Sequence, residues 1–268
     1  IIGMRGGIGN ATRPINMVDA HRYVDKSVHA DFVLNSPFCF IRTFNKNYFK
    51  KKNFVNSSLV KEYVNPIKKL NDSIYSKPNI MILVMESFGR EYIGAFNNNR
   101  KIKDYISYTP FLDSLSKNSL IFTNAFANGR QSIEALPSIL ASIPSFKVPF
   151  TSSPYSNQKI QSLVSVFKEK GYSTSFFHGA PNGSMGFLGL SNILGFDNYI
   201  GKNEFNDNSL YDGFWGIWDE PFLQYVNNTT TKLKEPFFST FFSLSSHEPF
   251  YVPNEYEGVF PLGDVQMH

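Results

Sequence analysis

The stretch that most constrains this chain is a short apolar run that ends in a carboxylate. Residues Ile80–Met85 are all apolar, and Glu86 follows them directly. The run shows no alternation between apolar and polar residues, which is typical of a strand that is covered on both faces. Strands of this kind occur in parallel sheets that carry helices on both sides. The run therefore predicts an α/β fold with a mostly parallel central sheet flanked by helices.

Three further apolar runs follow the same plan and are separated by segments with helical spacing. They cover Leu120–Phe126, Ser173–Phe177 and Pro236–Leu244. The first leads through a turn to Ser132, the second runs into His178, and the third is followed by His247. In a βα repeat the carboxyl ends of the strands lie at one edge of the sheet, where open α/β sheets bind their ligands. We therefore expect these three residues and Glu86 to share one edge.

Ser132 stands at the predicted start of a helix. Apolar residues recur after it at helical spacing, namely Ile133, Leu136, Ile139, Leu140 and Ile143. A helix N-terminus offers unpaired backbone N–H groups and the positive end of the helix dipole, which favour a phosphate or an alkoxide. Two interpretations stay open on this stretch alone. Ser132 is either a nucleophile beside an anion site or an ordinary N-cap.

The other polar residues at the predicted edge also have two interpretations each. Glu86 is either a metal ligand or the partner of a basic side chain, because a carboxylate is rarely buried alone. A lone histidine is usually structural, whereas His178 and His247 at corresponding strand ends are candidates to bind or protonate an anionic substrate. Asp219 and Glu220 are best explained as complements of a helix dipole, with metal binding as the alternative.

Composition excludes several classes of protein. The chain has 268 residues, a formal net charge of +4 and one cysteine, Cys39. One cysteine excludes an internal disulfide framework and a multi-cysteine zinc site, and the lack of a long basic run argues against nucleic acid as a partner. The positive charge suits an anionic membrane surface, although an ordinary solvated surface is the simpler explanation. No apolar run reaches the ~18–20 residues that a membrane helix needs.

The chain is predicted to divide into an N-terminal arm, residues 1–75, and a catalytic domain, residues 76–268. Within the arm, Ala30–Phe44 is expected to be a helix with aromatic residues on its inner face, and Lys46–Lys52 a solvated basic cluster. The chain begins with Ile1 and stops after a loop-like stretch. We therefore expect a fragment that lacks the C-terminal part of the domain.

Five motifs resemble those of one known family. They are Met-Glu-Ser-Phe at 85–88, Asn-Gly-Arg-Gln-Ser at 128–132, Phe-His-Gly-Ala at 177–180, Trp-Gly-Ile-Trp-Asp-Glu at 215–220 and Ser-Ser-His-Glu-Pro-Phe at 245–250. Their order and spacing are similar to those of the lipoteichoic acid synthase-like (phosphoglycerol transferase) branch of the alkaline phosphatase/sulfatase superfamily. The resemblance covers residues 77–268 and implies an alkaline phosphatase-like fold. The resemblance also implies that the N-terminal arm links the catalytic domain to membrane helices outside this chain.

The resemblance implies a role for each candidate residue. Glu86 matches the acidic metal ligand after the first strand, and Ser132 matches the metal-bound nucleophile, which is threonine in the best-known synthases. The metal implied is Mn²⁺, with Mg²⁺ and Zn²⁺ as alternatives. His247 and, less closely, His178 match positions around the substrate headgroup. Arg130 adjoins the nucleophile, and this proximity alone suggests a contact with phosphate.

The chain departs from the family pattern in two places. The family completes its metal site with an Asp-His pair downstream of the His-Glu-Pro-Phe region, and we expect this pair beyond His268. The Trp and Arg that bind glycerol phosphate in those synthases have no clear counterpart in Ala180–Leu190. The first departure leaves the predicted metal site incomplete within this chain, and the second leaves the headgroup open.

Neighbouring branches of the superfamily fit less well. Sulfatases build formylglycine within a Cys/Ser-x-Pro-x-Arg motif, and Ser132-Ile-Glu-Ala-Leu lacks both the Pro and the Arg. The phosphoethanolamine transferases are usually rich in disulfides, unlike this chain with its single cysteine.

Together the motifs imply a metal-dependent bacterial enzyme at the outer face of the cytoplasmic membrane. It would move a phosphoglycerol-type headgroup from a phospholipid donor to an envelope glycan or lipid acceptor, through a covalent phosphoserine at Ser132. Two alternatives stay open. One is a phosphodiesterase or sulfatase-type hydrolase that releases the group to water, and the other is a non-catalytic relative that binds anionic lipid.

Overall fold

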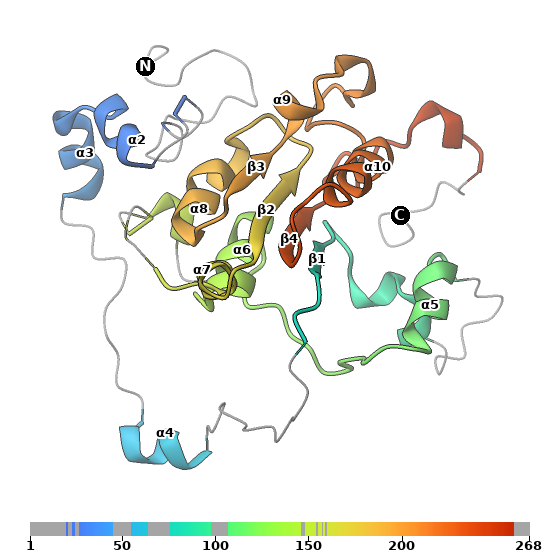
Figure 1. The fold of residues 1–268 in the computed structure, drawn as a ribbon, viewed down its shortest axis with the longest axis horizontal. Helices are drawn as coiled ribbons and strands as arrows, with labels where there is room; N and C mark the ends of the chain where they lie inside the picture. The colour runs from blue at the N-terminus through green and yellow to red at the C-terminus, as the bar shows by residue number, and fades with distance from the viewer. Residues whose placement is uncertain are drawn as a thin grey trace.

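The structure is a computed structural model that describes residues 20, 23–24, 27–44, 55–63, 76–97, 107–145, 148–153, 155–156, 158 and 160–259. Figure 1 shows a small sheet at the centre with helices packed around it, and short N-terminal helices at the periphery.

The core is a four-stranded parallel sheet. Its strands are β1 (Ile80–Val84), β2 (Ser173–His178), β3 (Asn198–Ile200) and β4 (Phe237–Phe242). Their order across the sheet is β1-β4-β2-β3, and each neighbouring pair runs parallel (Figure 1). The predicted α/β fold with a mostly parallel central sheet is therefore confirmed.

β4 sets the register of the sheet, because it lies between β1 and β2. Val84 of β1 and His178 of β2 both pair with Phe242 at the carboxyl end of β4. The three strands therefore end level, and the residues that follow them emerge at one edge. β3 was not predicted from sequence, since its 3 residues are too few to show a pattern.

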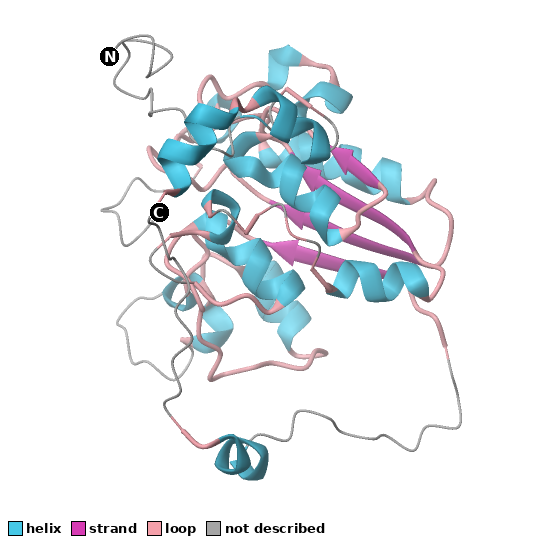
Figure 2. Ribbon diagram, turned by 90° about the vertical axis from the view of Figure 1, so that its left-hand side faces the viewer, coloured by secondary structure: helices cyan, strands magenta, loops and turns pink. Residues whose placement is uncertain are grey.

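Helices cover both faces of the sheet. The helices on one face are α6 (Ser132–Ala141), α7 (Leu163–Glu169) and α8 (Phe187–Leu194), and α10 (Asp219–Thr230) lies on the other. Figure 2 shows the strands running between these two layers. The arrangement is the one expected for parallel strands, which need cover on both sides.

Both interfaces between sheet and helices are packed with phenylalanine. On the first face, Phe176 and Phe242 share a cluster with Leu140 of α6. On the second face, Phe241 shares a cluster with Phe222 of α10. Full burial of one such side chain stabilises a fold by roughly 1.5–3 kcal/mol, so these two clusters are a major source of the stability of the domain.

The remaining helices are short. They are α2 (Ser27–Val33), α3 (Ser36–Thr43), α4 (Ser57–Tyr63), α5 (Pro110–Ser116) and α9 (Lys202–Phe205). In the described part of the chain, no helix has the length and apolar character needed to cross a membrane.

One predicted strand does not form. Residues Leu120–Phe126 lie in irregular structure between α5 and α6, and Phe126 is 91% exposed. The segment is held at one point, where the Thr123 carbonyl accepts a hydrogen bond from Arg90 Nη1 at 3.0 Å. Apolar composition favours a strand, but a strand also needs a hydrogen-bonded neighbour. This segment has no strand neighbour among the described residues, so the prediction was wrong.

β1 is covered on one face only, contrary to the expectation from its sequence. Ile82 packs toward the first cluster, whereas Met81 and Leu83 are exposed. The cluster under α10 contains side chains of β2 and β4. Among the described residues, no side chain of β1 belongs to it. The continuous apolar run therefore predicted the strand correctly but predicted more burial than the structure shows.

The predicted helix Ala30–Phe44 is in fact two helices, α2 and α3. Asn35 separates them, and its side chain accepts a hydrogen bond from the Phe38 N–H at 2.8 Å and so caps α3. The aromatic residues do not face inward as expected, because Phe40 is 61% exposed. Lys46–Lys52 lies outside the described residues, and the boundary between arm and domain stays a prediction.

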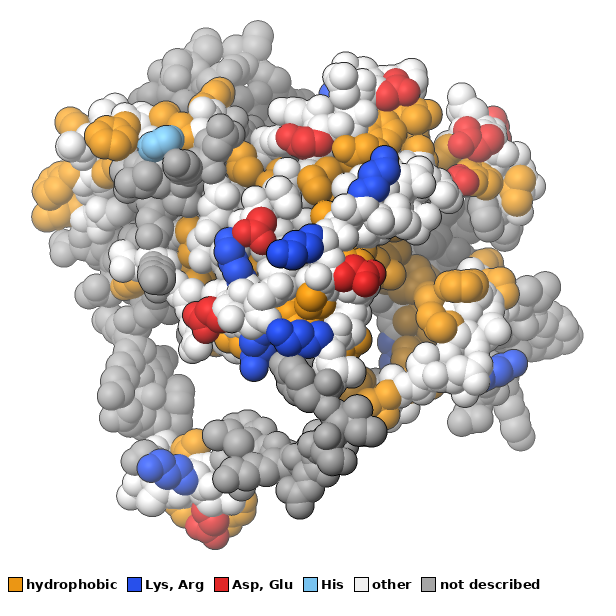
Figure 3. All heavy atoms as spheres, viewed as in Figure 1, with side chains coloured by type: hydrophobic (Ala, Val, Ile, Leu, Met, Phe, Trp, Pro, Cys, Tyr) orange, Lys and Arg blue, Asp and Glu red, His pale blue; other side chains and the backbone are white. Residues whose placement is uncertain are grey.

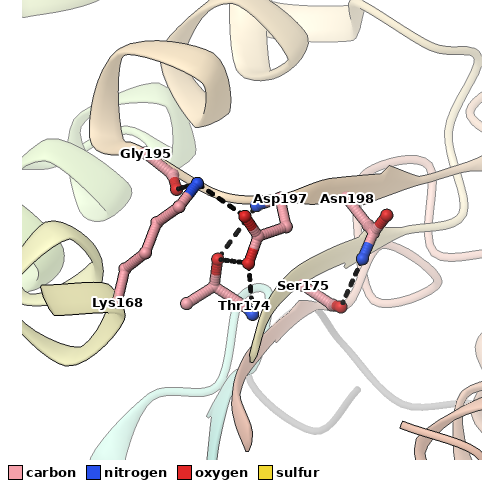
Figure 4. Close-up of polar contacts among 6 residues, drawn as sticks. All are labelled: Lys168, Thr174, Ser175, Gly195, Asp197 and Asn198. Carbon is pink, nitrogen blue, oxygen red and sulfur yellow. Dashed lines mark hydrogen bonds and ion pairs between the residues drawn. The ribbon is translucent and has the colours of Figure 1, made fainter. Parts of the chain in front are cut away.

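A polar clamp joins α7, β2 and β3 near the amino ends of the strands (Figure 4). The Asp197 carboxylate accepts hydrogen bonds from the N–H and the hydroxyl of Thr174, both at 2.9 Å, and pairs with Lys168 Nζ at 2.5 Å. Lys168 Nζ also donates to the carbonyl of Gly195 at 3.2 Å. Burial alone would raise the pKa of Asp197, but the hydrogen bonds from Lys168 and Thr174 outweigh it and lower the pKa.

The clamp yields a stability prediction. Asp197→Asn should lower the free energy of unfolding at pH 7 by about 1 kcal/mol, a value reduced for the solvent screening of this partly exposed pair. Because the folded-state pKa lies below the usual 3.8, the contribution of Asp197 is complete above that pH and is lost as the pH falls through the folded-state value. Urea unfolding at pH 7 and at pH 3 measures both effects.

The matched control is Glu169→Gln, which removes an exposed charge from the same helix and should change little. A wild-type free energy of unfolding for Asp197→Asn at pH 7 would contradict the assigned role of the clamp.

Candidate active site

Glu86 lies at the carboxyl end of β1, where the backbone turns sharply. Its N–H donates to the Oγ of Ser243, the residue after β4, at 2.7 Å. The N–H of Ser243 in turn donates to the carbonyl of Val84 at 3.0 Å. Ser87 has a φ of 52°, a left-handed conformation that turns the chain out of the strand direction. These contacts tie the ends of β1 and β4 together and fix Glu86 at the edge of the sheet.

Ser132 is the first residue of α6, and its side chain does not cap the helix. Gln131 occupies the N-cap position. The Ser132 hydroxyl instead donates to Oε2 of Glu86 at 2.7 Å. The N-cap interpretation of Ser132 was therefore wrong. The structure brings the predicted nucleophile and the predicted metal ligand into direct contact, although they are 46 residues apart in sequence.

Glu134 holds the loop that leads into Ser132. Its Oε2 accepts hydrogen bonds from the N–H groups of Arg130 at 2.7 Å and Gln131 at 3.1 Å, and its Oε1 accepts one from the Ser145 hydroxyl. The hydrogen bonds to the Glu134 carboxylate, above all the one from Ser145, lower its pKa, although burial alone would raise it. A Cβ at Gly129 would lie 2.6 Å from the Glu134 side chain, so the loop needs glycine there. Sequence analysis did not assign this role.

His178 is the last residue of β2 and is buried, with 1% of its surface exposed. Its Nδ1 lies 2.9 Å from the carbonyl oxygen of Phe242, and the rings of Phe187 and Phe242 pack around it. Burial lowers the pKa of His178 to about 4, so its imidazole is neutral at pH 7. A substrate cannot reach this side chain in the conformation described, and its predicted contact with a headgroup gains no support.

His247 lies in the loop after β4 and is partly exposed. Its ring packs against Trp215, with 4.1 Å between the ring centroids. The carbonyl oxygen of Glu248 lies 2.9 Å from His247 Nδ1 and also accepts a hydrogen bond from Trp215 Nε1 at 2.9 Å. Because a carbonyl accepts, Nδ1 carries the proton and Nε2 is the ring nitrogen left for a ligand. The loop begins at Ser243, which bonds Glu86, so His247 belongs to the same region of the sheet edge.

Asp219 positions this loop, and sequence analysis missed that role. Its carboxylate accepts hydrogen bonds from the N–H groups of Leu244 at 2.9 Å and Ser245 at 2.8 Å, and its own N–H donates to Ser245 Oγ at 2.8 Å. Burial raises the pKa of Asp219, although the N–H groups that bond it act in the opposite direction. Local sequence carries no signal for this role, because the nearest partner is 25 residues away.

Asp219 and Glu220, for which metal binding was the alternative interpretation, belong to no group of three or more possible metal ligands among the described residues. The Asp219 carboxylate is engaged by backbone N–H groups, and Glu220 accepts a hydrogen bond from the Tyr256 hydroxyl. Both residues do lie in the first turn of α10, where acidic side chains complement the helix dipole.

Glu86 and Ser132 bring two oxygen donors together at the edge of the sheet. A carboxylate and a hydroxyl are hard oxygen donors, which suit Mn²⁺ or Mg²⁺. The described residues contain no group of three or more His, Cys, Asp and Glu side chains that could hold an ion. The two residues therefore fit a divalent ion as two of its ligands, and a complete site needs further donors. Arg130 is exposed close to this pair, and its contact with phosphate stays a prediction.

The parallel sheet, with a carboxylate at one strand end bonded to a serine at a helix start, has the fold of a domain of the alkaline phosphatase superfamily. The structure is similar to a protein of that superfamily from Vibrio parahaemolyticus, with a TM-score of 0.56 and 25% identity over 66% of this chain and 42% of that one. A model of the sulfatase family matches residues 78–266. The chain therefore belongs to the sulfatase family.

Further relatives support the lipoteichoic acid synthase-like branch of this superfamily. The structure is similar to the lipoteichoic acid synthase LtaP from Listeria monocytogenes, with a TM-score of 0.55 and 26% identity over 67% of this chain and 43% of that one. The sequence is 22% identical to the lipoteichoic acid synthase-like YvgJ from Bacillus subtilis over 205 residues, and this match covers 70% of this chain. The chain spans 32% of the length of YvgJ.

The role assigned to Glu134 is testable. Glu134→Gln removes the negative charge of a side chain that accepts three hydrogen bonds, and hydrogen bonds to a charged acceptor are stronger than those to a neutral one. We expect a loss of about 1–3 kcal/mol in the free energy of unfolding. Urea unfolding checks this, with the exposed Glu257→Gln as the control. Equal stability of Glu134→Gln and the wild type would show that Glu134 does not hold the loop.

Proposed function

We propose that this protein is a metal-dependent transferase of the cell envelope. It moves a phosphoglycerol-type headgroup from a phospholipid to an envelope glycan or lipid acceptor through a phosphoserine at Ser132. The observation that carries the proposal is the 2.7 Å hydrogen bond from Ser132 Oγ to Glu86 Oε2 at the N-terminus of α6. Ser132 is not the N-cap of its helix, so helix capping does not account for its hydroxyl.

The geometry suits attack on a phosphodiester. The hydrogen bond to Glu86 directs the Ser132 proton toward the carboxylate and leaves lone pairs of Oγ free for phosphorus. The first turn of α6 presents backbone N–H groups and the positive end of the helix dipole, both of which favour the negative phosphate oxygens. Ser132 therefore lies where a nucleophile and an anion site coincide.

The proposed reaction has two steps. First, a bond forms between Ser132 Oγ and phosphorus, the bond from phosphorus to the diacylglycerol oxygen breaks, and that oxygen takes up the proton released by the serine. Second, a hydroxyl of the acceptor attacks the same phosphorus, the bond to Oγ breaks, and Ser132 regains a proton from the acceptor. His247 Nε2, the ring nitrogen that the Glu248 carbonyl does not engage, is the group that we propose contacts the headgroup.

The metal would be held by Glu86 and Ser132 together with further ligands. When bound, a divalent ion lowers the pKa of the serine hydroxyl and neutralises charge that develops on the phosphate. Mn²⁺ is favoured by the resemblance to the synthases, and Mg²⁺ and Zn²⁺ are the alternatives for the same oxygen donors.

The relatives support the proposed donor, acceptor and location. LtaP is a lipoteichoic acid synthase and YvgJ is described as similar to one, and the name implies chemistry on an envelope polymer. We therefore place the domain on the outer face of the bacterial cytoplasmic membrane, with the membrane reached through segments outside this chain.

Ser132 is the first residue to test. Ser132→Ala should reduce turnover by at least ~1,000-fold, because it removes the hydroxyl that would form the covalent intermediate. Ser132→Thr should keep measurable activity, since it retains a hydroxyl. Release of diacylglycerol from phosphatidylglycerol by the enzyme as the cell makes it is the readout. Ser138→Ala on the same helix is the control, and a near wild-type rate for Ser132→Ala would sink the proposed mechanism.

Glu86 separates metal binding from a purely structural role. Glu86→Gln keeps the size of the side chain and removes its charge, so the affinity for Mn²⁺ should fall by about tenfold or more. Isothermal titration calorimetry measures this without any turnover. The exposed Glu91→Gln is the control for loss of charge near the site. Unchanged affinity in Glu86→Gln would leave Glu86 as a structural partner of Ser132.

A further inference from the structure

Exposed aromatic side chains lie beside His247 on two neighbouring loops. Phe214 and Trp215 belong to the loop before α10, and Tyr251 belongs to the loop after β4. These three side chains are 58%, 43% and 54% exposed, and we call them the aromatic shelf. The ring centroids of Phe214 and Tyr251 lie 5.1 Å apart, and Trp215 packs on His247. Large aromatic side chains left in water beside a candidate site usually mark a contact with a ligand.

The loop that carries Phe214 and Trp215 is anchored at the edge of the sheet. Tyr211 and Ile217 pair across it in an antiparallel bridge, which makes it a small hairpin. The N–H of Ile217 donates to the carbonyl of Gly179, the residue after β2, at 3.0 Å. A Cβ at Gly216 would lie 2.4 Å from that carbonyl oxygen, so the close approach needs glycine. The hairpin therefore lies on the carboxyl end of β2, at the edge that carries the candidate site.

Hydrogen bonds hold the aromatic shelf in place. Asp212 Oδ1 accepts from the N–H groups of Phe214 and Trp215, both at 2.8 Å, and from that of Gly216 at 3.0 Å. Trp215 Nε1 donates to the carbonyl of Glu248 at 2.9 Å and so joins the hairpin to the loop after β4. A surface that is fixed before binding loses less conformational freedom when a ligand arrives. The aromatic shelf is thus preorganised.

The segments that build the shelf carry negative charge and no positive charge. Residues 203–231 and 235–259 contain no Lys and no Arg. Their acidic residues are Glu204, Asp207, Asp212, Asp219, Glu220, Glu235, Glu248, Glu255 and Glu257. Figure 3 shows red acidic side chains on the turn at the upper right, where Figure 1 draws η7 (Asn254–Tyr256). The charge around the shelf therefore complements a cation.

We propose that the aromatic shelf binds an alkylammonium group of a substrate. The face of an aromatic ring attracts a cation, and the carboxylates of the two loops add attraction over a longer range. The same hairpin already holds one ammonium group, since Lys202 Nζ lies 4.5 Å from the centroid of the Tyr211 ring. A ligand on the shelf would lie next to His247, which packs on Trp215. This inference does not depend on the chemistry at Ser132.

The charge disfavours other occupants of the shelf. A free phosphate, an anionic bilayer or a second copy of this chain would bring negative charges together, and like charges oppose association. A neutral sugar could pack on the rings but would gain nothing from the charge of the carboxylates. Two sources of an alkylammonium group share the chemistry, namely a lipid headgroup and an amino sugar of an envelope glycan. The test distinguishes these sources.

The test measures the binding of small probes to the 268-residue chain without any donor lipid. Trp215 and Trp218 are its two tryptophans, so in Trp218→Phe the fluorescence reports on Trp215 alone. Choline should bind at least ~10-fold more tightly than 3,3-dimethylbutanol, which has a similar shape and no charge. The difference should shrink as salt rises from about 0.05 M to about 0.5 M. Isothermal titration calorimetry on the wild type makes the same comparison without the Trp218 substitution.

Two further pairs of probes identify the source of the ammonium group. Glucosamine is compared with glucose, and glycerophosphocholine with glycerophosphoglycerol. Tighter binding of the amine in the first pair assigns the shelf to an amino sugar, and in the second pair to a lipid headgroup. The proposal requires this difference in at least one pair.

Variants test the aromatic rings and the charge separately. Phe214→Ala combined with Tyr251→Ala should weaken choline binding by about tenfold, whereas Tyr251→Phe keeps the ring and should bind like the wild type. Glu248→Gln should weaken binding by about threefold, as expected for an exposed charge. The matched controls are Phe111→Ala and Glu169→Gln, which remove an exposed ring and an exposed charge elsewhere. Both should bind choline like the wild type, and so should Ser132→Ala.

Three results would overturn the proposal. They are equal binding of choline and its neutral analogue, equal binding within both further pairs, and controls that weaken binding as much as the shelf variants do. Tight binding of glucose together with glucosamine would assign the shelf to neutral sugars instead. Loss of turnover in Ser132→Ala with normal choline binding would leave the proposal intact, because the probes do not react.

Discussion

The parallel pairing of β4 with both β1 and β2 is the constraint on which the candidate site depends. It ends the three strands at the same level, with Val84 and His178 opposite Phe242. The chain can then exchange hydrogen bonds across the strand ends, as Glu86 and Ser243 do. The two phenylalanine clusters hold the sheet between its helices, and one of them includes Leu136 and Leu140 of α6. Packing of that helix thus brings Ser132 to Glu86.

Carboxylates that accept hydrogen bonds from backbone N–H groups position both loops of the candidate site. Glu134 binds the backbone before Ser132, and Asp219 binds the backbone between β4 and His247. In both places an acceptor-only side chain takes up backbone N–H groups that a loop would otherwise leave unpaired. The two loops nearest the site are therefore rigid for the same physical reason. The candidate nucleophile, Ser132, and the candidate headgroup contact, His247, depend on different carboxylates, so a defect in one loop need not disturb the other.

Sequence alone predicted the parts of this structure that depend on local patterns. Apolar runs revealed β1, β2 and β4, and helical spacing revealed α6. It failed where partners are distant. Leu120–Phe126 has the composition of a strand, yet it has no strand neighbour among the described residues. One face of β1 likewise has no cluster of described side chains packed against it. The sequence predicted that Ser132 and Glu86 share one edge of the sheet, but it did not predict their direct contact. It also did not predict the burial of His178, because that burial depends on the aromatic rings packed around it.

The most direct test of the central claim is to trap the covalent intermediate. The enzyme as the cell makes it is mixed with Mn²⁺ and phosphatidylglycerol, quenched in acid and digested, and its peptides are analysed by mass spectrometry. The account predicts glycerol phosphate added to the peptide that contains Ser132, and the addition should be absent in Ser132→Ala. Diacylglycerol release without any label on Ser132, or a label on another residue that persists in Ser132→Ala, would contradict it.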